Sequence, residues 1–136
     1  MKLLRILLLG LFVGALVLAA CGGSSTPAGP KVSAEAEKYL SLKGDSTAGK
    51  QKFEVTCSAC HGPDAKGLPG LGKDLTTSAF AKGLPDAELI LFVTKGLAPG
   101  DPANTTGILM PPRGGNPALA DQDLADIVTY VRTLEK

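Results

Sequence analysis

Two cysteines and a histidine lie close together near the middle of the chain, as Cys57-Ser58-Ala59-Cys60-His61. In this C-x-x-C-H pattern, the two thiols are spaced to form thioether bonds with the two vinyl groups of one haem. The adjoining His61 is then held beneath the iron as its proximal ligand. The spacing therefore predicts one covalently attached haem.

A C-x-x-C pair also occurs in dithiol redox proteins and in zinc sites. A thioredoxin-like protein would surround the pair with alternating strands and helices, and no such pattern surrounds Cys57. A zinc site needs further ligands, but Cys21 is the only other cysteine and His61 is the only histidine of the chain. Haem attachment is therefore the favoured interpretation of the motif.

The iron of such a haem has a sixth position, and a methionine is the candidate to fill it. Met1 falls in a segment that we expect to be removed, which leaves Met110 as the only thioether of the mature protein. Pro111 and Pro112 follow it, and their fixed φ angles make this loop stiff. Met110 could instead be a gap-filling core residue. Because cytochromes that transfer electrons use His/Met ligation, we favour Met110 as the sixth ligand.

The stretch from about Asp45 to Lys136 resembles a small class I cytochrome c domain of bacterial type. Five segments follow the order of that family: Gly49-x-x-x-Phe53, Cys57-Ser58-Ala59-Cys60-His61-Gly62, Gly70-Leu71-Gly72-Lys73-Asp74-Leu75, Met110-Pro111-Pro112 and Tyr130-Val131-Arg132-x-Leu134. The resemblance implies an all-α fold of about three to five short helices around one covalently attached haem. It also implies that the backbone carbonyl of Lys73, where the family commonly has proline, accepts a hydrogen bond from the proximal histidine.

Two helices are predicted from the residues at their ends, one before the C-x-x-C-H motif and one after it. The first begins at Asp45 as N-cap and runs into the Cys57 region. Gly49 lies in its interior, where glycine costs about 1 kcal/mol against alanine, so we expect another helix to approach closely there. The second covers about residues 85–96, with acidic residues in its first turn and Gly96 at its end. Its apolar run would also suit a buried strand, but these end signals favour a helix.

A third helix is predicted near the C-terminus, with Asp121 as its N-cap. Its apolar residues recur at helical spacing and form one stripe: Leu124, Ile127, Val128, Val131 and Leu134. We expect the charged residues to lie largely outside this stripe: Asp123, Asp126, Arg132 and Glu135. The periodicity predicts a helix with one face in the core.

The N-terminus has the order of an export signal. Lys2 and Arg5 precede an uncharged apolar run over residues 6–18, which is shorter than a membrane-spanning helix needs. The following Leu18-Ala19-Ala20-Cys21 resembles a bacterial lipobox, which implies cleavage before Cys21 and lipidation of its sulfur. A structural free cysteine and an uncleaved anchor are the alternatives. Two or three acyl chains would give lasting membrane attachment.

We therefore expect three parts: a lipoprotein signal peptide over residues 1–20, a lipidated N-terminus with a flexible tether over 21–44, and a cytochrome c domain over 45–136. Residues 22–33 are dominated by Gly, Ser, Thr, Ala and Pro and lack apolar periodicity, which predicts a flexible segment. Residues 34–43 contain helix formers and can form a short helix.

Charge excludes one class of partner. Without Lys2 and Arg5 the chain has 12 basic and 13 acidic residues, a balance that gives no general attraction to nucleic acid. Together these features predict a membrane-tethered monohaem carrier, not an enzyme, that passes single electrons between redox proteins outside the cytoplasm. We expect a monomer, anchored by its lipid at the outer face of a bacterial membrane or in the periplasm. The alternative is a haem module of an oxidase or dehydrogenase complex, or a haem enzyme with a displaceable Met110.

Overall fold

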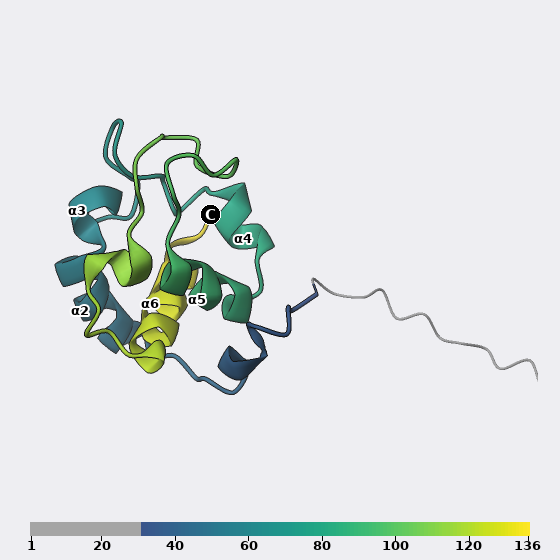
Figure 1. Cartoon of the computed structure of the whole chain (residues 1–136). Coiled ribbons are helices and arrows are strands. Elements are labelled where there is room, and N and C mark those ends of the chain that lie inside the picture. Colours follow the sequence, from purple (N-terminus) through teal and green to yellow (C-terminus); the bar gives the residue numbers. More distant parts are fainter. Residues whose placement is uncertain (1–30) are drawn as a thin grey trace, which may run out of the picture.

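The computed structural model describes residues 31–136, so the expected signal peptide and Cys21 lie outside the described residues. This part of the chain is helical (Figure 1), with the elements η1 (Glu37–Tyr39), α2 (Ser46–Thr56), α3 (Ser58–His61), α4 (Ala79–Gly83), α5 (Asp86–Lys95), η2 (Pro112–Gly115) and α6 (Asp121–Leu134). Strand-like pairing in it is limited to one antiparallel bridge between Leu97 and Met110. The prediction of a small all-α fold is confirmed. None of the helices over residues 31–136 has the length and apolar character needed to cross a membrane.

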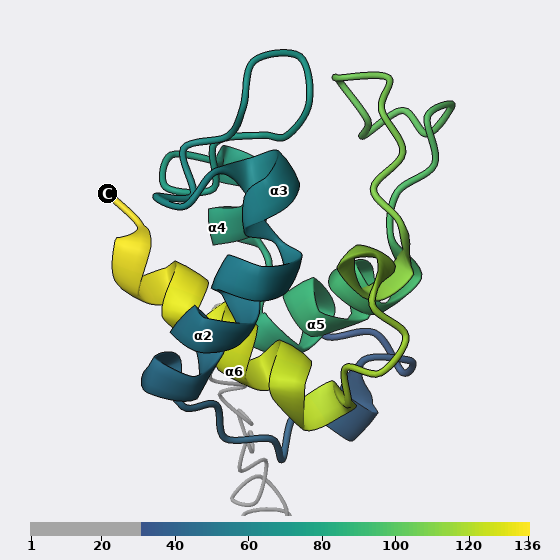
Figure 2. The same ribbon diagram turned by 90° about the vertical axis from the view of Figure 1, so that its left-hand side faces the viewer.

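Helices α2 and α6 form the centre of the domain (Figure 2). The Asp45 carboxylate accepts hydrogen bonds from the backbone N–H groups of Thr47 and Ala48, which caps α2 as predicted. A Cβ atom added to Gly49 would lie 1.9 Å from the carbonyl oxygen of Asp126 in α6. The expected close approach of a second helix at Gly49 is therefore confirmed. One turn later, the fully buried Phe53 ring packs edge-on against Tyr130, with the ring centroids 5.5 Å apart.

Helix α5 packs against α6 and forms one wall of the core. The segment is a helix and not a strand, and it ends at Gly96, whose φ of +71° suits glycine. Its buried residues are Ala87, Leu89, Ile90 and Leu91. The acidic first turn and the terminal glycine thus predicted the helix correctly, whereas the apolar run alone would also have suited a strand.

The predicted stripe of α6 faces the core, but the predicted N-cap of this helix was wrong. The N-cap is Ala120 and not Asp121, and the Asp123 carboxylate accepts from the Ala120 N–H at 2.7 Å. Asp126, which the sequence places outside the stripe, is also buried. The start of α2 covers that side of α6, and the Asp126 carboxylate accepts from the Asp45 N–H at 2.9 Å and from Lys52 Nζ at 2.7 Å.

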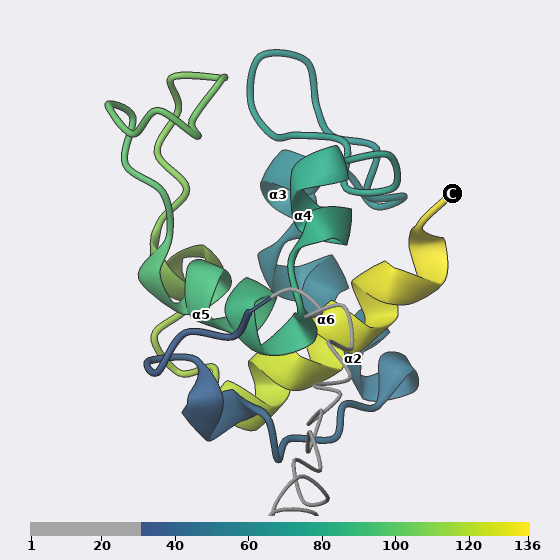
Figure 3. The same ribbon diagram turned by 90° about the vertical axis from the view of Figure 1, so that its right-hand side faces the viewer.

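Residues 33–44, which we call the strap, pack on the outside of α5 (Figure 3). From the sequence we expected this segment to be part of the tether and to form a short helix. The structure instead shows one 3-10 turn in it. Tyr39 is buried and its hydroxyl donates to Thr94 at 3.3 Å, while Glu35 pairs with Lys95 at 2.5 Å. The strap belongs to the packed domain because Ala36 and Tyr39 cover apolar surface of α5.

Candidate haem-binding site

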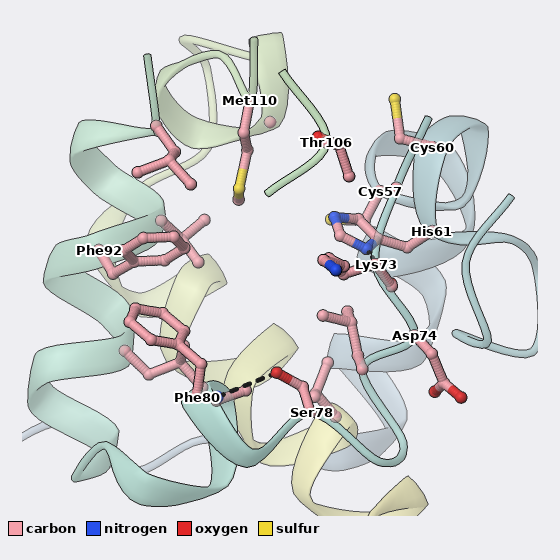
Figure 4. A pocket seen from close by; sticks show the side chains of 18 of the residues that line it. Cys57, Cys60, His61, Lys73, Asp74, Ser78, Phe80, Phe92, Thr106 and Met110 are labelled. Carbon is pink, nitrogen blue, oxygen red and sulfur yellow. Dashed lines mark hydrogen bonds between the residues drawn. The ribbon is translucent and has the colours of Figure 1, made fainter. Parts of the chain in front are cut away.

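An apolar cavity of about 710 Å³ opens between α3, α4, α5 and the loop that carries Met110 (Figure 4). Its volume falls in the range of about 300–1,000 Å³ that small-molecule and cofactor sites occupy. Apolar residues from α2, α4, α5, α6 and the loop before α4 supply the lining: Phe53, Leu75, Phe80, Leu89, Phe92, Ile127, Val128 and Val131. Phe80 and Phe92 stack edge-on in this wall, with their centroids 5.0 Å apart. The cavity therefore suits a large, flat, mainly apolar group.

The structure brings together at this cavity the four residues that the sequence singled out: Cys57, Cys60, His61 and Met110. Cys57 ends α2, and the single turn of α3 carries Cys60 and His61 to the cavity wall. Figure 4 shows the His61 ring and the Met110 thioether pointing into the cavity from two sides, with the Cys60 sulfur at the rim. Cys21, the fifth of the predicted site residues, lies outside the described residues.

The orientation of the His61 ring is fixed by one backbone contact. Its Nδ1 atom lies 2.9 Å from the carbonyl oxygen of Lys73. A carbonyl only accepts, so Nδ1 is the nitrogen that carries the proton of this hydrogen bond. This tautomer leaves Nε2 as a free ligand on the cavity side, which is the arrangement that metal-binding histidines use. The hydrogen bond expected at Lys73 is therefore present.

Residues 62–75 form a loop that folds back over α3 and holds Lys73 in place. The N–H groups of Gly67 and Leu68 donate to the carbonyls of His61 and Cys60, at 2.7 and 3.1 Å. A Cβ added to Gly72 would lie 2.2 Å from the Cys60 carbonyl oxygen. The sequence analysis included Gly72 in one of the segments that resemble the family, but it did not predict that Gly72 packs on the turn that carries the cysteines.

The Met110 backbone is held from the side of α5. Its N–H donates to the Leu97 carbonyl at 3.0 Å, and its carbonyl accepts from the Leu97 N–H at 2.7 Å. Gly96 makes this pairing possible, since a Cβ there would lie 2.4 Å from the Met110 carbonyl oxygen. Gly96 thus has a second role beyond ending α5, which the sequence analysis missed. Met110 is therefore restrained both by the stiff segment of Pro111 and Pro112 that follows it and by this backbone pairing with Leu97.

Beyond the prolines the chain returns to the cysteine side of the cavity. Arg113 adopts a left-handed conformation, with φ of +54°. Its guanidinium donates to the Leu119 carbonyl at 2.8 Å and to the Asp121 carboxylate at 2.6 Å. The next residue, Gly114, lies so close that a Cβ there would be 4.0 Å from Cys57 Sγ. The Met110 loop and the cysteine turn therefore lie next to each other.

The environment of Cys57 does not suit redox exchange. Burial raises the pKa of this thiol to about 11, and the neighbouring Cys60 adds a smaller effect in the same direction. Dithiol redox sites instead depend on a cysteine of lowered pKa. Residues 31–136 also contain no group of three or more His, Cys, Asp or Glu side chains that could bind a metal ion. Both alternatives to haem thus lose support in the part of the chain that the structure describes.

The residues present fit a haem: two thiols adjoin an oriented histidine, a thioether lies across from them, and the space between is apolar. Comparison with known proteins points to the same group. The family model for cytochrome c matches residues 46–135. Cytochrome c-555 of Prosthecochloris aestuarii is 32% identical over 100 residues, which are 72% of this chain and 91% of that protein.

Two further relatives differ in how much of their length is matched. Cytochrome c-554(548) of Halomonas halodenitrificans is 33% identical over 92 residues, 68% of this chain and 99% of that protein. The cbb3-type cytochrome c oxidase subunit FixP of Bradyrhizobium sp. is 42% identical over 60 residues, 43% of this chain but only 21% of that subunit. No solved structure matches significantly. On the family match and the full-length relatives, the chain belongs to the cytochrome c family, and its cofactor is one covalently bound haem c.

Proposed function

We propose that the protein is a one-electron carrier, in which Cys57 and Cys60 attach the haem and His61 and Met110 are its axial ligands. The observation that carries the proposal is the placement of the His61 ring and the Met110 thioether on two sides of one apolar cavity. The haem supplies an iron that changes its charge by one electron. With both axial positions filled by the protein, no position is left for a substrate.

The chain's own residues keep these two ligands in place in both oxidation states. The Lys73 carbonyl fixes the His61 ring, and the pairing with Leu97 fixes the Met110 backbone. The apolar lining limits the water near the site, and a methionine ligand favours a higher potential than a second histidine would. A preorganised site of this kind needs little rearrangement when an electron arrives or leaves.

A second candidate function is that of a haem module in an oxidase or dehydrogenase complex. The match to an oxidase subunit favours it, although this match covers a small part of that subunit. Catalysis at the iron itself would require Met110 to leave, and the chain offers no second histidine for peroxide chemistry. The carrier is therefore the better supported proposal.

The ligation by Met110 can be tested by spectroscopy on the purified haem protein. Ferric wild-type protein should show the weak near-infrared sulfur-to-iron band of His/Met cytochromes. Met110→Ala should abolish the band, lower the potential and let the reduced protein bind carbon monoxide. Met110→His should also lose the band but keep carbon monoxide out, since a ligand is restored. If the reduced wild type binds carbon monoxide readily and its ferric form lacks the band, the sixth position is open and an enzyme or gas-binding function replaces the carrier.

The attachment itself is tested by mass. The denatured mature domain should carry the mass of one haem, and acid-acetone extraction should leave it on the peptide. Replacing His61 should remove the strong-field ligand and prevent normal maturation. A haem that extracts freely, or bound zinc in its place, would contradict the roles given to Cys57 and Cys60.

We further propose that the domain is a monomer tethered to a membrane by lipid on Cys21 and exchanges electrons with redox proteins outside the cytoplasm. The composition of residues 21–32 supports a flexible tether, and about a dozen such residues give a root-mean-square reach of about 20 Å. Cys21→Ala should release the protein from the membrane fraction or block its processing. The N-terminal peptide of the wild type should carry acyl chains, and an unmodified N-terminus at another residue would contradict the anchor.

A further inference from the structure

The loop from Leu97 to Met110 holds its two arms together by only one strand-like pair. In an antiparallel ladder, the hydrogen-bonded pairs recur at every second residue. The pair after Leu97 and Met110 would therefore join positions 99 and 108. Position 99 is Pro99, which has no N–H to donate. The Ile108 carbonyl is thus deprived of the donor that a longer ladder would give it.

The side chain of Asn104 supplies that donor. Its Nδ2 atom donates to the Ile108 carbonyl at 2.7 Å and to the Ala98 carbonyl at 3.0 Å. Ala98 follows Leu97 on one arm, and Ile108 lies two residues before Met110 on the other. One amide group therefore joins the two arms beside the Leu97 and Met110 pair, where the ladder stops.

The oxygen of the same side chain shapes the turn that leads to Met110. Asn104 Oδ1 accepts from the Thr106 N–H at 3.2 Å, the Thr106 hydroxyl at 3.0 Å and the Gly107 N–H at 2.9 Å. Both N–H groups and the carbonyl of this carboxamide are thus engaged. Asn104 is half-buried and lines the cavity. The Asn104 side chain therefore connects both arms and the turn of a loop that has no regular secondary structure.

We propose that Asn104 is a positioning residue for Met110, and that its donating amide keeps the thioether directed into the cavity. This inference rests on Met110 being the ligand in the proposed function. Asn104 acts through the Ile108 carbonyl and the backbone that follows it. Because methionine ligation favours the ferrous iron, weaker positioning should show first in the ferric protein.

The test measures how easily imidazole replaces Met110 in the ferric haem protein. Asn104→Ala should raise the imidazole affinity by about tenfold or more, the scale of one or two net hydrogen bonds, and weaken the sulfur-to-iron band. Asn104→Asp keeps the three accepted hydrogen bonds and loses the two donated ones, so it should raise the affinity by a similar factor. If Asn104→Asp binds imidazole as the wild type does, the donor role is wrong.

Asp101→Ala is the matched control in the same loop. Among residues 31–136, the Asp101 carboxylate accepts only from the Ala103 N–H, at 2.8 Å, within one turn, so this variant should change imidazole affinity by less than about twofold. An effect as large as that of Asn104→Ala would mean general loosening of the loop and would overturn the proposal. Met110→Ala distinguishes the failure of the ligand assignment from the failure of the Asn104 proposal. If this variant binds imidazole as the wild type does, Met110 is not the ligand, whatever the Asn104 variants do.

Hydrogen exchange in the wild type gives a second test that needs no variant to mature. The side-chain N–H groups of Asn104 and the backbone N–H of Gly107 should exchange slowly, because each is engaged inside the loop. Exchange at the rate of a free side-chain amide would overturn the proposal.

Discussion

The carbonyl oxygen of Lys73 lies 2.9 Å from Nδ1 of His61. The contact uses the backbone, so the lysine side chain is not what holds the ring. What places this carbonyl is the packing of Gly72 on the Cys60 carbonyl and the hydrogen bond from Gly67 to His61. The orientation of His61 therefore depends on how closely residues 62–75 lie on α3.

Gly72→Ala should disturb that contact. The added methyl group would meet the Cys60 carbonyl at 2.2 Å, so the loop must move away, at a cost of about 1–3 kcal/mol for overpacking. The His61 hydrogen bond to Lys73 should weaken, which makes the imidazole a poorer donor to ferric iron and raises the reduction potential. Thermal unfolding and voltammetry of the haem protein measure both effects. Gly83→Ala is the control, because its added methyl would meet no group within 4 Å in residues 31–136 beyond its own helix backbone and neighbours. Equal melting temperatures for the two variants would contradict the role of Gly72.

Gly49→Ala should disrupt the packing of α2 on α6. Helix propensity alone favours alanine by about 1 kcal/mol, but the methyl group would meet the Asp126 carbonyl oxygen at 1.9 Å. The backbone of α6 cannot retreat without uncovering Phe53, so we expect a net loss of about 3 kcal/mol or more in the free energy of unfolding. Denaturant unfolding measures it. A variant as stable as the wild type would show that the two helices can separate freely.

The sequence could predict the features that depend on local signals. The spacing of Cys57, Cys60 and His61 needs one turn of helix, and the structure provides it in α3. Gly49 could be predicted as a contact because glycine is costly inside a helix. The cap at Asp45 likewise depends on its nearest neighbours in the chain.

The features that could not be predicted depend on residues far apart in the sequence. Asp126 lies outside the apolar stripe of α6, and it is buried because α2 packs on that side of the helix. The contact of Asn104 with both arms of its loop depends on the path of the chain between Ala98 and Ile108. The strap contains few apolar residues, and its burial follows from the surface that α5 offers to Tyr39.

The strap leads to a prediction about truncation. The sequence predicts a domain that begins at Asp45, but a chain that begins there lacks Ala36 and Tyr39, both buried against the core. Its free energy of unfolding should fall by about 3–5 kcal/mol, the cost of removing a large buried side chain. A chain that begins at Ser33 should unfold as the full-length protein does. Guanidinium unfolding of both haem-loaded chains measures the difference, and equal midpoints would show that the strap contributes nothing.

The ion pair between buried Asp126 and half-buried Lys52 should give the domain an acid-sensitive part of its stability. Burial by itself raises the pKa of Asp126, but hydrogen bonds from Lys52, the Asp45 N–H and Gln122 more than offset this, so the pKa lies below its ordinary value. A carboxylate with a lowered pKa stabilises the fold above about pH 4, and this contribution is lost as the pH falls through the folded-state pKa.

Asp126→Asn should therefore lower the free energy of unfolding by about 1–3 kcal/mol at pH 7, because it removes the negative partner of Lys52 while it keeps an oxygen for the Asp45 N–H. The gap between variant and wild type should close as the pH falls below about 4, where the wild-type carboxylate also loses its charge. Urea unfolding at a series of pH values measures the gap. Glu54→Gln, which breaks the exposed pair with Lys50, should cost less than about 0.5 kcal/mol at every pH. A gap for Asp126→Asn that stays constant down to pH 2 would show that the side chain stabilises the domain by its shape and not by its charge.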